Sequence, residues 1–221
     1  MTTHLHRDLA DLSQDILAMG TAVGAALEQA SEALVSRRVS VAEQVLAGDA
    51  RIDARELEID DDCLKILALH QPVASDLRQV TASMKINNDL ERIGDLAVNI
   101  AERALDLSGR QPLNRELHFE QMTSAARWML SSALRSLVEN DVSLAREVCA
   151  RDDEVDDINR LHFGSLIAHM EAHPGDVAVC LDYLTASLHL ERVADLATNI
   201  AEDVIFLVDA VDVRHQHPPR S

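Results

Sequence analysis

Two nearly identical acidic segments stand one hundred residues apart in this chain of 221 residues. The first, LERIGDLAVNIAE, covers residues 90–102, and the second, LERVADLATNIAE, covers residues 190–202. Ten of the thirteen positions are identical. Residues three or four positions apart lie on the same face of a helix. Each segment therefore predicts a polar stripe, formed by Glu91, Asp95, Asn99 and Glu102 in the first copy and by Glu191, Asp195, Asn199 and Glu202 in the second.

A second pair of carboxylates precedes each segment by roughly forty residues, again at four-residue spacing. Two helices packed side by side would direct four carboxylates to one point. Such an oxygen-rich site suits the hard cations Mg, Ca, Mn and Fe better than thiophilic metals. The predicted metal ligands are Asp49, Asp53, Glu91 and Asp95 in one half of the chain and Asp152, Asp156, Glu191 and Asp195 in the other.

Few basic residues are placed to neutralise these carboxylates within their own helices. Glu91 and the glutamates that end the two stripes have no Lys or Arg three or four positions away. The local candidates are Arg92 beside Asp95, Arg192 beside Asp195 and Arg160 beside Asp156. A run of acids is ordinarily a solvated helix face. Retention of the same acids in both copies favours a cation site over that alternative.

Apolar residues recur at spacings of three and four through most of the chain, which predicts an all-α fold. The helices that position the acids are expected over about 5–36, 40–70, 73–107, 116–139, 141–172 and 176–213. SGRQPLN, residues 108–114, is the clearest loop. The plan is two tandem repeated three-helix bundles with six long helices, over residues 1–109 and 115–213, followed by a disordered tail over 214–221.

Local signals set the expected helix ends. Ser40 and Glu43 form a capping-box pattern, and Pro72 suits the first turn of the third helix. Asp141 and Asp176 are expected to cap the fifth and sixth helices. Inside the repeated segments, the apolar positions are expected to face the core: Leu90, Ile93, Ala97 and Ile100, with Leu190, Val193, Ala197 and Ile200.

Composition supports a helical bundle and restricts the partners. Apolar residues make up 47% of the chain and aromatic residues only 2%, which is typical of helix bundles. The formal net charge of −18 argues against nucleic-acid binding and against adhesion to anionic lipid, and favours cations or a partner with a basic face. The longest uncharged stretch, residues 16–27, is too short to span a bilayer. Three scattered cysteines and an acidic start without a signal pattern predict a reduced, cytoplasmic protein.

No catalytic constellation is evident in the sequence. There is no Glu-x-x-His pair, Gly-rich phosphate loop, nucleophile elbow or Cys-His pairing. The helical histidines at positions 70, 162, 169 and 189 are weak ligand candidates, because a lone His on a helix is usually not a ligand. The residues therefore predict a protein without enzymatic turnover.

Residues 70–102, HQPVASDLRQVTASMKINNDLERIGDLAVNIAE, resemble the signature region of the PhoU family of phosphate-signalling accessory proteins. The resemblance extends from about residue 5 to residue 212, and the doubled Glu/Asp-x-x-x-Asp motif makes it specific. The second repeat is the looser match, because it lacks the Asp-Leu-Arg found at residues 76–78.

The resemblance implies multinuclear metal ions, such as iron, zinc, manganese or magnesium, on the eight acidic residues. It implies a cytoplasmic homodimer whose partners are the ATPase subunit of a phosphate ABC transporter and a phosphate-sensing histidine kinase, with the membrane reached only indirectly. Such a regulator restrains phosphate uptake and the starvation response when phosphate is plentiful. Two alternatives stay open: a carboxylate-bridged metal enzyme or metal-storage protein, and a structural bundle whose acids serve solubility.

Overall fold

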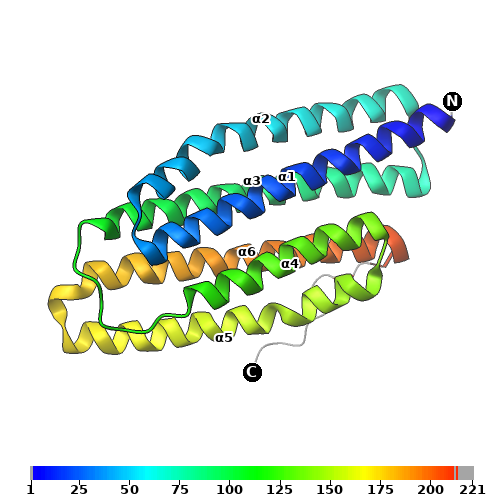
Figure 1. The fold of residues 1–221 in the computed structure, drawn as a ribbon. Helices are drawn as coiled ribbons and strands as arrows, with labels where there is room; N and C mark the ends of the chain where they lie inside the picture. Colours follow the sequence, from blue (N-terminus) through cyan, green and yellow to red (C-terminus); the bar gives the residue numbers. More distant parts are fainter. Residues whose placement is uncertain (1, 212, 214–221) are drawn as a thin grey trace.

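The computed structural model describes residues 2–211 and 213, and in these residues it confirms an all-α fold of six long helices without strands. Figure 1 shows the helices as two groups of three, one above the other. The predicted tail over residues 214–221 lies outside the described residues. The helices are α1 (Thr2–Ser36), α2 (Val39–His70), α3 (Ala74–Ser108), α4 (Phe119–Glu139), α5 (Val142–Ala172) and α6 (Val177–Asp209), with a short 3-10 turn, η1 (Pro174–Asp176).

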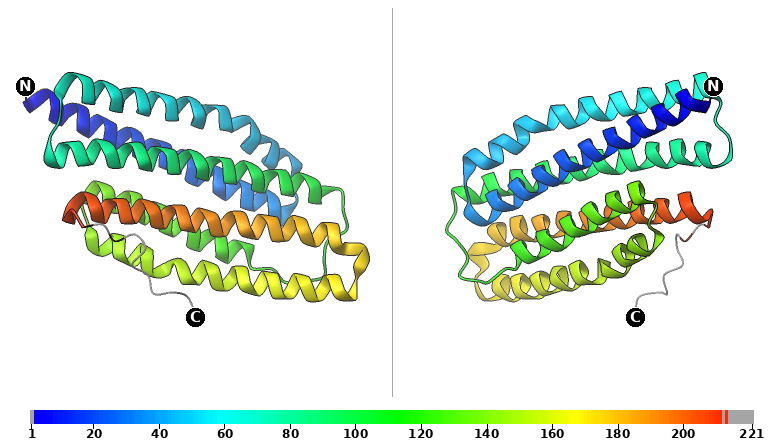
Figure 2. Two further views of the ribbon diagram at one scale, coloured as in Figure 1. Left: turned by 180° about the vertical axis from the view of Figure 1, so that it is seen from behind. Right: turned by 45° about the vertical axis from the view of Figure 1, so that its right-hand side comes forward.

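The two helix groups pack along two seams. Within each group all three helices contact one another, and between the groups α3 packs on α6 while α1 packs on α4. In Figure 2, α2 and α5 are the outermost helices of the two groups in both views. The acid-bearing helices α2 and α3 therefore belong to one group, and α5 and α6 to the other, as the repeat predicts.

The core follows the predicted apolar faces. The apolar positions of the first repeated segment are fully buried, and so are their equivalents one hundred residues later: Leu90, Ile93, Ala97, Ile100, Leu190, Val193, Ala197 and Ile200. Full burial of an aliphatic side chain contributes about 1.5–3 kcal/mol relative to exposure. This burial fixes the rotation of α3 and α6 and leaves Asp95 and Asp195 exposed. Glu202, which was expected to end the second polar stripe, is instead buried, with 7% exposure.

Several expected helix ends are wrong in detail. Asp141 does cap α5, because its Oδ1 accepts a hydrogen bond of 3.0 Å from the backbone N–H of Leu144. Ser40 does not cap α2, which begins after Arg38 without a side-chain cap. Asp176 precedes α6 but gives it no side-chain cap, because its Oδ2 lies 2.9 Å from Nε2 of His169.

The lengths of three helices also differ from expectation. Helix α3 starts at Ala74, so Pro72 lies in the connection and not in the first turn. Helix α4 starts at Phe119, three residues later than predicted, and α6 ends at Asp209 and not at residue 213. The apolar periodicity persists past these ends because the connecting residues also contact the core, as Leu113, Leu117 and Val213 do.

Candidate metal centre

The acids of the first repeat flank a close approach between α2 and α3. A Cβ atom placed on Gly94 would lie 3.2 Å from Cγ2 of Ile52, which is tighter than ordinary van der Waals contact. Ile52 stands between the two aspartates of α2, and Gly94 stands between Glu91 and Asp95 of α3. The contact that the missing side chain of Gly94 permits therefore brings the two acidic pairs toward each other.

Electrostatics shows that these four carboxylates share one environment. Burial raises the pKa of Asp49 above its usual value, and the charges of Asp53 and Asp95 raise it further. The pKa of Glu91 is raised by burial first, and then by Asp95, Glu56, Asp53 and Asp49. The carboxylates thus repel one another across the two helices, and a bound cation would relieve that repulsion.

One oxygen of this cluster has no partner of its own. Oδ1 of Asp49 is buried without a hydrogen bond. A buried carboxylate oxygen in this condition is costly unless a proton or a cation satisfies it. The donor set around it consists of oxygens alone, which suits a hard cation. The first-repeat residues therefore fit the kind of metal that the sequence predicts.

The side chains do not already converge as a finished ligand cage. Within residues 2–211 and 213, no three His, Cys, Asp or Glu side chains stand in position to hold one ion. The first-repeat acids would need rotamer changes to coordinate a metal together. Whether all eight predicted residues bind metal stays a prediction.

Glu56 is a member of the first-repeat cluster that the predicted ligand set omits. Burial raises its pKa, as do the charges of Asp60 and Asp53. The signal was present in the sequence, because Glu56 follows Asp53 by three positions and so shares its helix face. Asn87 of α3 holds this part of α2 in place, since its Nδ2 donates hydrogen bonds to the backbone oxygen of Glu56 at 2.9 Å and to Oδ1 of Asp60 at 3.1 Å.

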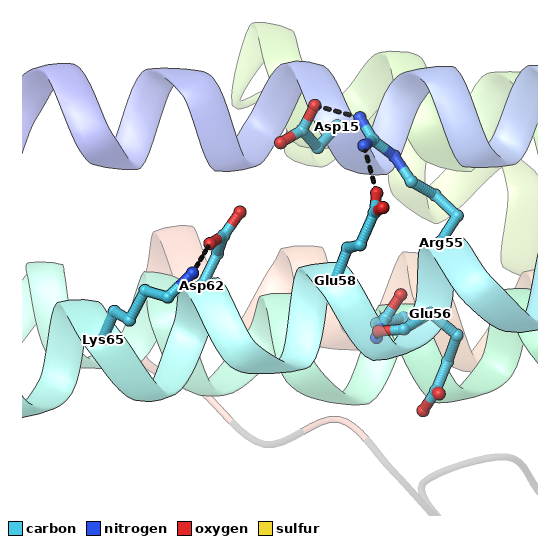
Figure 3. A network of polar contacts seen from close by, with 7 residues as sticks. Asp15, Arg55, Glu56, Glu58, Asp62 and Lys65 are labelled. Atoms are coloured by element: carbon cyan, nitrogen blue, oxygen red, sulfur yellow. Dashed lines mark hydrogen bonds and ion pairs between the residues drawn. The ribbon is translucent and has the colours of Figure 1, made fainter.

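Two basic residues of α2, Arg55 and Lys65, pair outside the predicted ligand set, as Figure 3 shows. Arg55 pairs with Asp15 of α1 and, at 2.8 Å, with Glu58. Lys65 lies 2.8 Å from Asp62, one turn away on the same helix. These ion pairs engage Arg55 and Lys65 with acids other than Asp49 and Asp53.

The arginines expected to neutralise the motif acids behave differently in the two repeats. Arg92 does not neutralise Asp95 as the spacing suggested, because its Nη1 lies 3.6 Å from Oδ1 of Asp89. In the second repeat Arg160 does approach its predicted partner, with Nη1 3.9 Å from Oδ2 of Asp156. Asp156 is 5% exposed, whereas the equivalent Asp53 is exposed.

Three of the four helical histidines make contacts away from the acidic motifs. His70 pairs with Asp8 at 2.9 Å, and His169 lies between Asp176 and Arg115. His162 is buried, accepts the backbone N–H of His118 at its Nε2, and has its pKa lowered to about 4 mainly by burial. The contacts of His70, His162 and His169 favour packing roles over metal ligation. His189 differs, because its Nδ1 is buried without a hydrogen bond; burial and the charges of Arg103 and Arg192 lower its pKa, while Glu102 acts in the opposite direction.

Ion pairs also join the two repeats across the seam of α3 and α6. Nζ of Lys85 lies 2.8 Å from Oδ1 of Asp203, which is 6% exposed. Beside it, burial raises the pKa of Asp89 to about 6, an effect that the charge of Asp203 increases and those of Arg92 and Lys85 reduce. At the other end of the seam, Arg103 lies 3.4 Å from Asp182. The partners belong to different repeats, so helical periodicity within one segment does not predict these pairs.

The fold and the site define a class: duplicated six-helix proteins with a carboxylate cluster between neighbouring helices. The PhoU domain model matches residues 16–104 and again residues 119–204. The chain belongs to the PhoU family. The two matches fall one on each group of three helices.

Similarity to known relatives covers nearly the whole chain. A phosphate-specific transport system accessory protein PhoU homolog of Aquifex aeolicus is 35% identical over 213 residues, which are 96% of each chain. A homolog of the same description in Pseudomonas aeruginosa is 36% identical over 217 residues, or 97% of this chain and 89% of the relative.

Solved structures show the same fold. The crystal structure of PhoU from Pseudomonas aeruginosa aligns with a TM-score of 0.90 at 35% identity, over 93% of this chain and 99% of that one. The phosphate transport system regulatory protein PhoU from Streptococcus pneumoniae aligns with a TM-score of 0.88 at 30% identity, over 95% and 99%. Among the described residues, none of the helices has the length and apolarity needed to cross a bilayer.

Proposed function

We propose that this protein is a non-enzymatic regulator of phosphate transport that acts in the cytoplasm. The observation that carries the proposal is its similarity, over 96% of its length, to a phosphate-specific transport system accessory protein. The relative solved from Streptococcus pneumoniae is described as a phosphate transport system regulatory protein. The net charge of −18 supports action through cations and basic partner surfaces, not through nucleic acid.

The proposed partners are the ATPase subunit of a phosphate ABC transporter and a phosphate-sensing histidine kinase. The protein would act as an adaptor between them, as a homodimer, and would repress uptake and the starvation response when phosphate is plentiful. A phosphate-starvation reporter, such as alkaline phosphatase output, tests this role in a deletion strain grown with abundant phosphate. High output that the restored gene reverses is the expected result, and normal repression in the deletion strain would refute the proposal.

The adaptor is also proposed to bind metal. Asp49, Asp53, Glu91 and Asp95 would hold ions in the first repeat, and Asp152, Asp156, Glu191 and Asp195 in the second. The buried, unsatisfied Oδ1 of Asp49 and the mutual repulsion within its cluster support this proposal. When bound, iron, zinc, manganese or magnesium would neutralise the carboxylates and tie α2 to α3 and α5 to α6.

Elemental analysis of the purified protein tests metal binding. Native protein should carry metal, and a variant with Asp49→Asn and Asp95→Asn should lose the part held by the first repeat. Equal metal content in the two proteins would exclude these residues as ligands. The structural alternative, in which the acids serve solubility alone, predicts that equality.

A further inference from the structure

The linker between the two repeats, residues 109–118, lies along a part of α5 that α4 does not reach. Phe119, the first residue of α4, packs on His162 of α5 with ring centroids 4.7 Å apart, so residues 163–172 extend past α4. Figure 1 shows the linker running beside this part of α5. Among the described residues, no backbone group of residues 111–117 bonds to another backbone group. Side chains therefore hold the linker in place.

Two leucines of the linker complete a small apolar cluster between α5 and α6. The cluster consists of Leu166, Cys180 and Leu184, of which the first two are fully buried. Leu113 and Leu117 pack against it and are themselves partly buried, while the other linker residues are exposed. The linker thus contributes the cover of this cluster, and the accessibility of the Cys180 thiol depends on its position.

Two buried histidines of α5 hold the linker by accepting hydrogen bonds from it. His162 is 1% exposed and His169 is 6% exposed, and their spacing places both on the face that carries Leu166. Nε2 of His162 accepts the backbone N–H of His118 at 2.9 Å. Nδ1 of His169 accepts the Nε–H of Arg115 at 3.2 Å. An imidazole nitrogen accepts a hydrogen bond only when it carries no proton, so both contacts require a neutral ring.

The other nitrogen of each ring is occupied within the second repeat. Nδ1 of His162 lies 2.9 Å from Oγ of Ser187, which donates its own hydrogen to Asn159, so Nδ1 carries the proton of this ring. Nε2 of His169 lies 2.9 Å from Oδ2 of Asp176, to which it donates. Each ring can therefore take up a further proton only at the nitrogen that faces the linker, and that proton removes the hydrogen bond.

The groups around His169 favour release of the linker once the ring is protonated. Asp176 of η1 then stabilises the charged ring, whereas the guanidinium of Arg115 is repelled by it. His173, at the end of α5, stacks on His169 with ring centroids 4.4 Å apart. On α6, Cys180 stays a neutral thiol, because burial and Asp176 raise its pKa and outweigh the opposite effect of Arg115.

The surroundings of His162 oppose protonation while the linker is in place. Phe119 of α4 packs on the ring, and Tyr183 of α6 stacks on Phe119 with centroids 5.7 Å apart. The ring of His118 on the linker lies 6.5 Å away. Burial, with a smaller contribution from His118, lowers the pKa of His162 from 6.5 to about 4. The bound linker thus keeps this ring neutral at pH values where a solvated histidine is charged.

Arg37, in the turn between α1 and α2, anchors the start of the linker without a histidine. Its Nη1 donates to the carbonyl oxygen of Arg110 at 2.7 Å, and its Nη2 donates to the hydroxyl of Tyr183 at 2.9 Å. A guanidinium keeps its charge throughout the pH range in which proteins fold. Acid therefore leaves the linker tethered at residue 110 and acts on the residues after it.

We propose that the linker is a releasable strap: neutral His162 and His169 hold it on the second repeat, and acidification frees it and uncovers the apolar cluster beneath. Release requires neither metal nor partner, so the inference goes beyond the proposed function and is tested separately from it. A freed linker exposes His162 to solvent, where the ring binds a proton more tightly. Release should therefore become up to about tenfold more favourable for each pH unit between 6.5 and 4.

Thiol labelling of the full chain at a series of pH values measures this release. Dithiodipyridine reacts with Cys180 only when the cluster is uncovered, and mass spectrometry identifies the labelled cysteine. Cys63 is also fully buried, on α2, which contacts only α1 and α3 among the described helices, so it reports unfolding of the chain. Relative to urea-unfolded chain at the same pH, labelling of Cys180 should accelerate by up to about tenfold per pH unit between 6.5 and 4, while Cys63 stays protected.

Substitutions that keep an acceptor but cannot be protonated test the two histidines. His162→Gln places an amide oxygen near the position of Nε2, and His169→Asn places one near the position of Nδ1. Each should remove part of the acid-induced labelling of Cys180, and the double variant should remove it altogether. His70→Gln is the matched control, because His70 pairs with Asp8 in the first repeat, and it should leave the profile unchanged.

Two labelling results would overturn the proposal. One is a Cys180 profile of the native chain that does not change with pH, and the other is an equal acceleration at Cys63, which would mean that the whole chain unfolds. Nitrogen NMR of the native chain at pH 7 tests the same contacts without any substitution, should a variant fail to fold. His162 should carry its proton on Nδ1 and His169 on Nε2, and the opposite tautomers would refute the two hydrogen bonds from the linker.

Discussion

Asp49 illustrates how one side chain can cost stability in the absence of a ligand. Burial and two neighbouring carboxylates raise its pKa in the folded protein, so folding favours its protonated form. Metal-free protein should therefore gain stability as the pH falls toward that pKa. Asp49→Asn should stabilise the metal-free protein at pH 7 by up to about 1 kcal/mol, after allowance for solvent screening.

Urea unfolding of metal-free protein, with and without added Mn²⁺, measures the unfolding free energy without metal and the stabilisation that metal provides. The native protein should be stabilised by Mn²⁺, and Asp49→Asn should lose much of that gain. Glu43→Gln, an exposed acid of the same helix, is the matched control and should leave both values unchanged. A loss of metal-free stability in Asp49→Asn would show that its carboxylate has a structural role.

Asp89 gives the protein a pH dependence closer to neutrality. Its folded pKa is about 6, raised mainly by burial, whereas the usual value is 3.8. The folded state therefore binds the proton more tightly, and stability should rise as the pH falls from 7 through 6 toward 4, by at most about 3 kcal/mol. Asp89→Asn should remove this component, so the difference in unfolding free energy between the two proteins should shrink steadily below pH 6. A pH-independent difference would contradict the assignment.

The crossing of α2 and α3 depends on a residue that has no side chain. Gly94 is in contact with Ile52, whereas Gly24 in α1 has open space where a Cβ would lie. Gly94→Val should therefore force the helices apart and cost about 1–3 kcal/mol by overpacking. Gly24→Val, the matched control, should be neutral or slightly stabilising, because it removes a glycine from a helix interior.

Thermal melting and Mn²⁺ titration together check this helix-level prediction. Gly94→Val should lower both stability and Mn²⁺ affinity, since separation of α2 from α3 also separates their carboxylates. If Gly94→Val lost stability but bound Mn²⁺ normally, the close approach would serve packing alone. Equal melting of the two glycine variants would mean that α2 moves aside at little cost.

Helix existence was predictable from this sequence, but several helix ends were not. Leu90, Ile93 and their counterparts in the second repeat predict the buried faces of α3 and α6, because the apolar periodicity is repeated over many turns. A cap depends on the local geometry of one residue: Asp141 accepts its expected hydrogen bond, while Asp176 is directed to His169 instead. The pairing of Arg92 with Asp89 was not predictable for a related reason. Both Asp89 and Asp95 lie three positions from Arg92, and spacing alone does not show that Asp89 is the one that becomes buried.

Sequence patterns do not predict how the two repeats pack on each other, because this packing depends on contacts between residues that are 79 and 118 positions apart. The acidic pairs were predictable since each lies within one helix. The seam of α3 and α6 instead joins Lys85 to Asp203, and Arg103 to Asp182, which no periodicity reveals. In a protein of net charge −18, these cations lie where two acidic halves meet. The seam should therefore be sensitive to loss of a single positive charge.

Lys85→Met tests the dependence of the whole molecule on that seam. Removal of the ammonium group leaves Asp203 buried beside Asp89 without its cation, which should cost about 1–2 kcal/mol, less than a fully buried pair because Lys85 is partly exposed. Arg127→Met is the matched control. It removes the 2.7 Å pair with Glu28 in the seam of α1 and α4. The side chain of Glu28 is 57% exposed against 9% for that of Asp203, so the cost should stay below about 1 kcal/mol.

Urea unfolding of Lys85→Met, Asp203→Asn and the double variant isolates the interaction. The double variant should recover most of the stability that Lys85→Met loses, because no unpaired carboxylate then remains at position 203. If the two losses simply add, the ion pair contributes nothing and apolar packing alone joins the repeats. If Lys85→Met instead produces two separate unfolding transitions, the charge is what makes the repeats unfold as one unit.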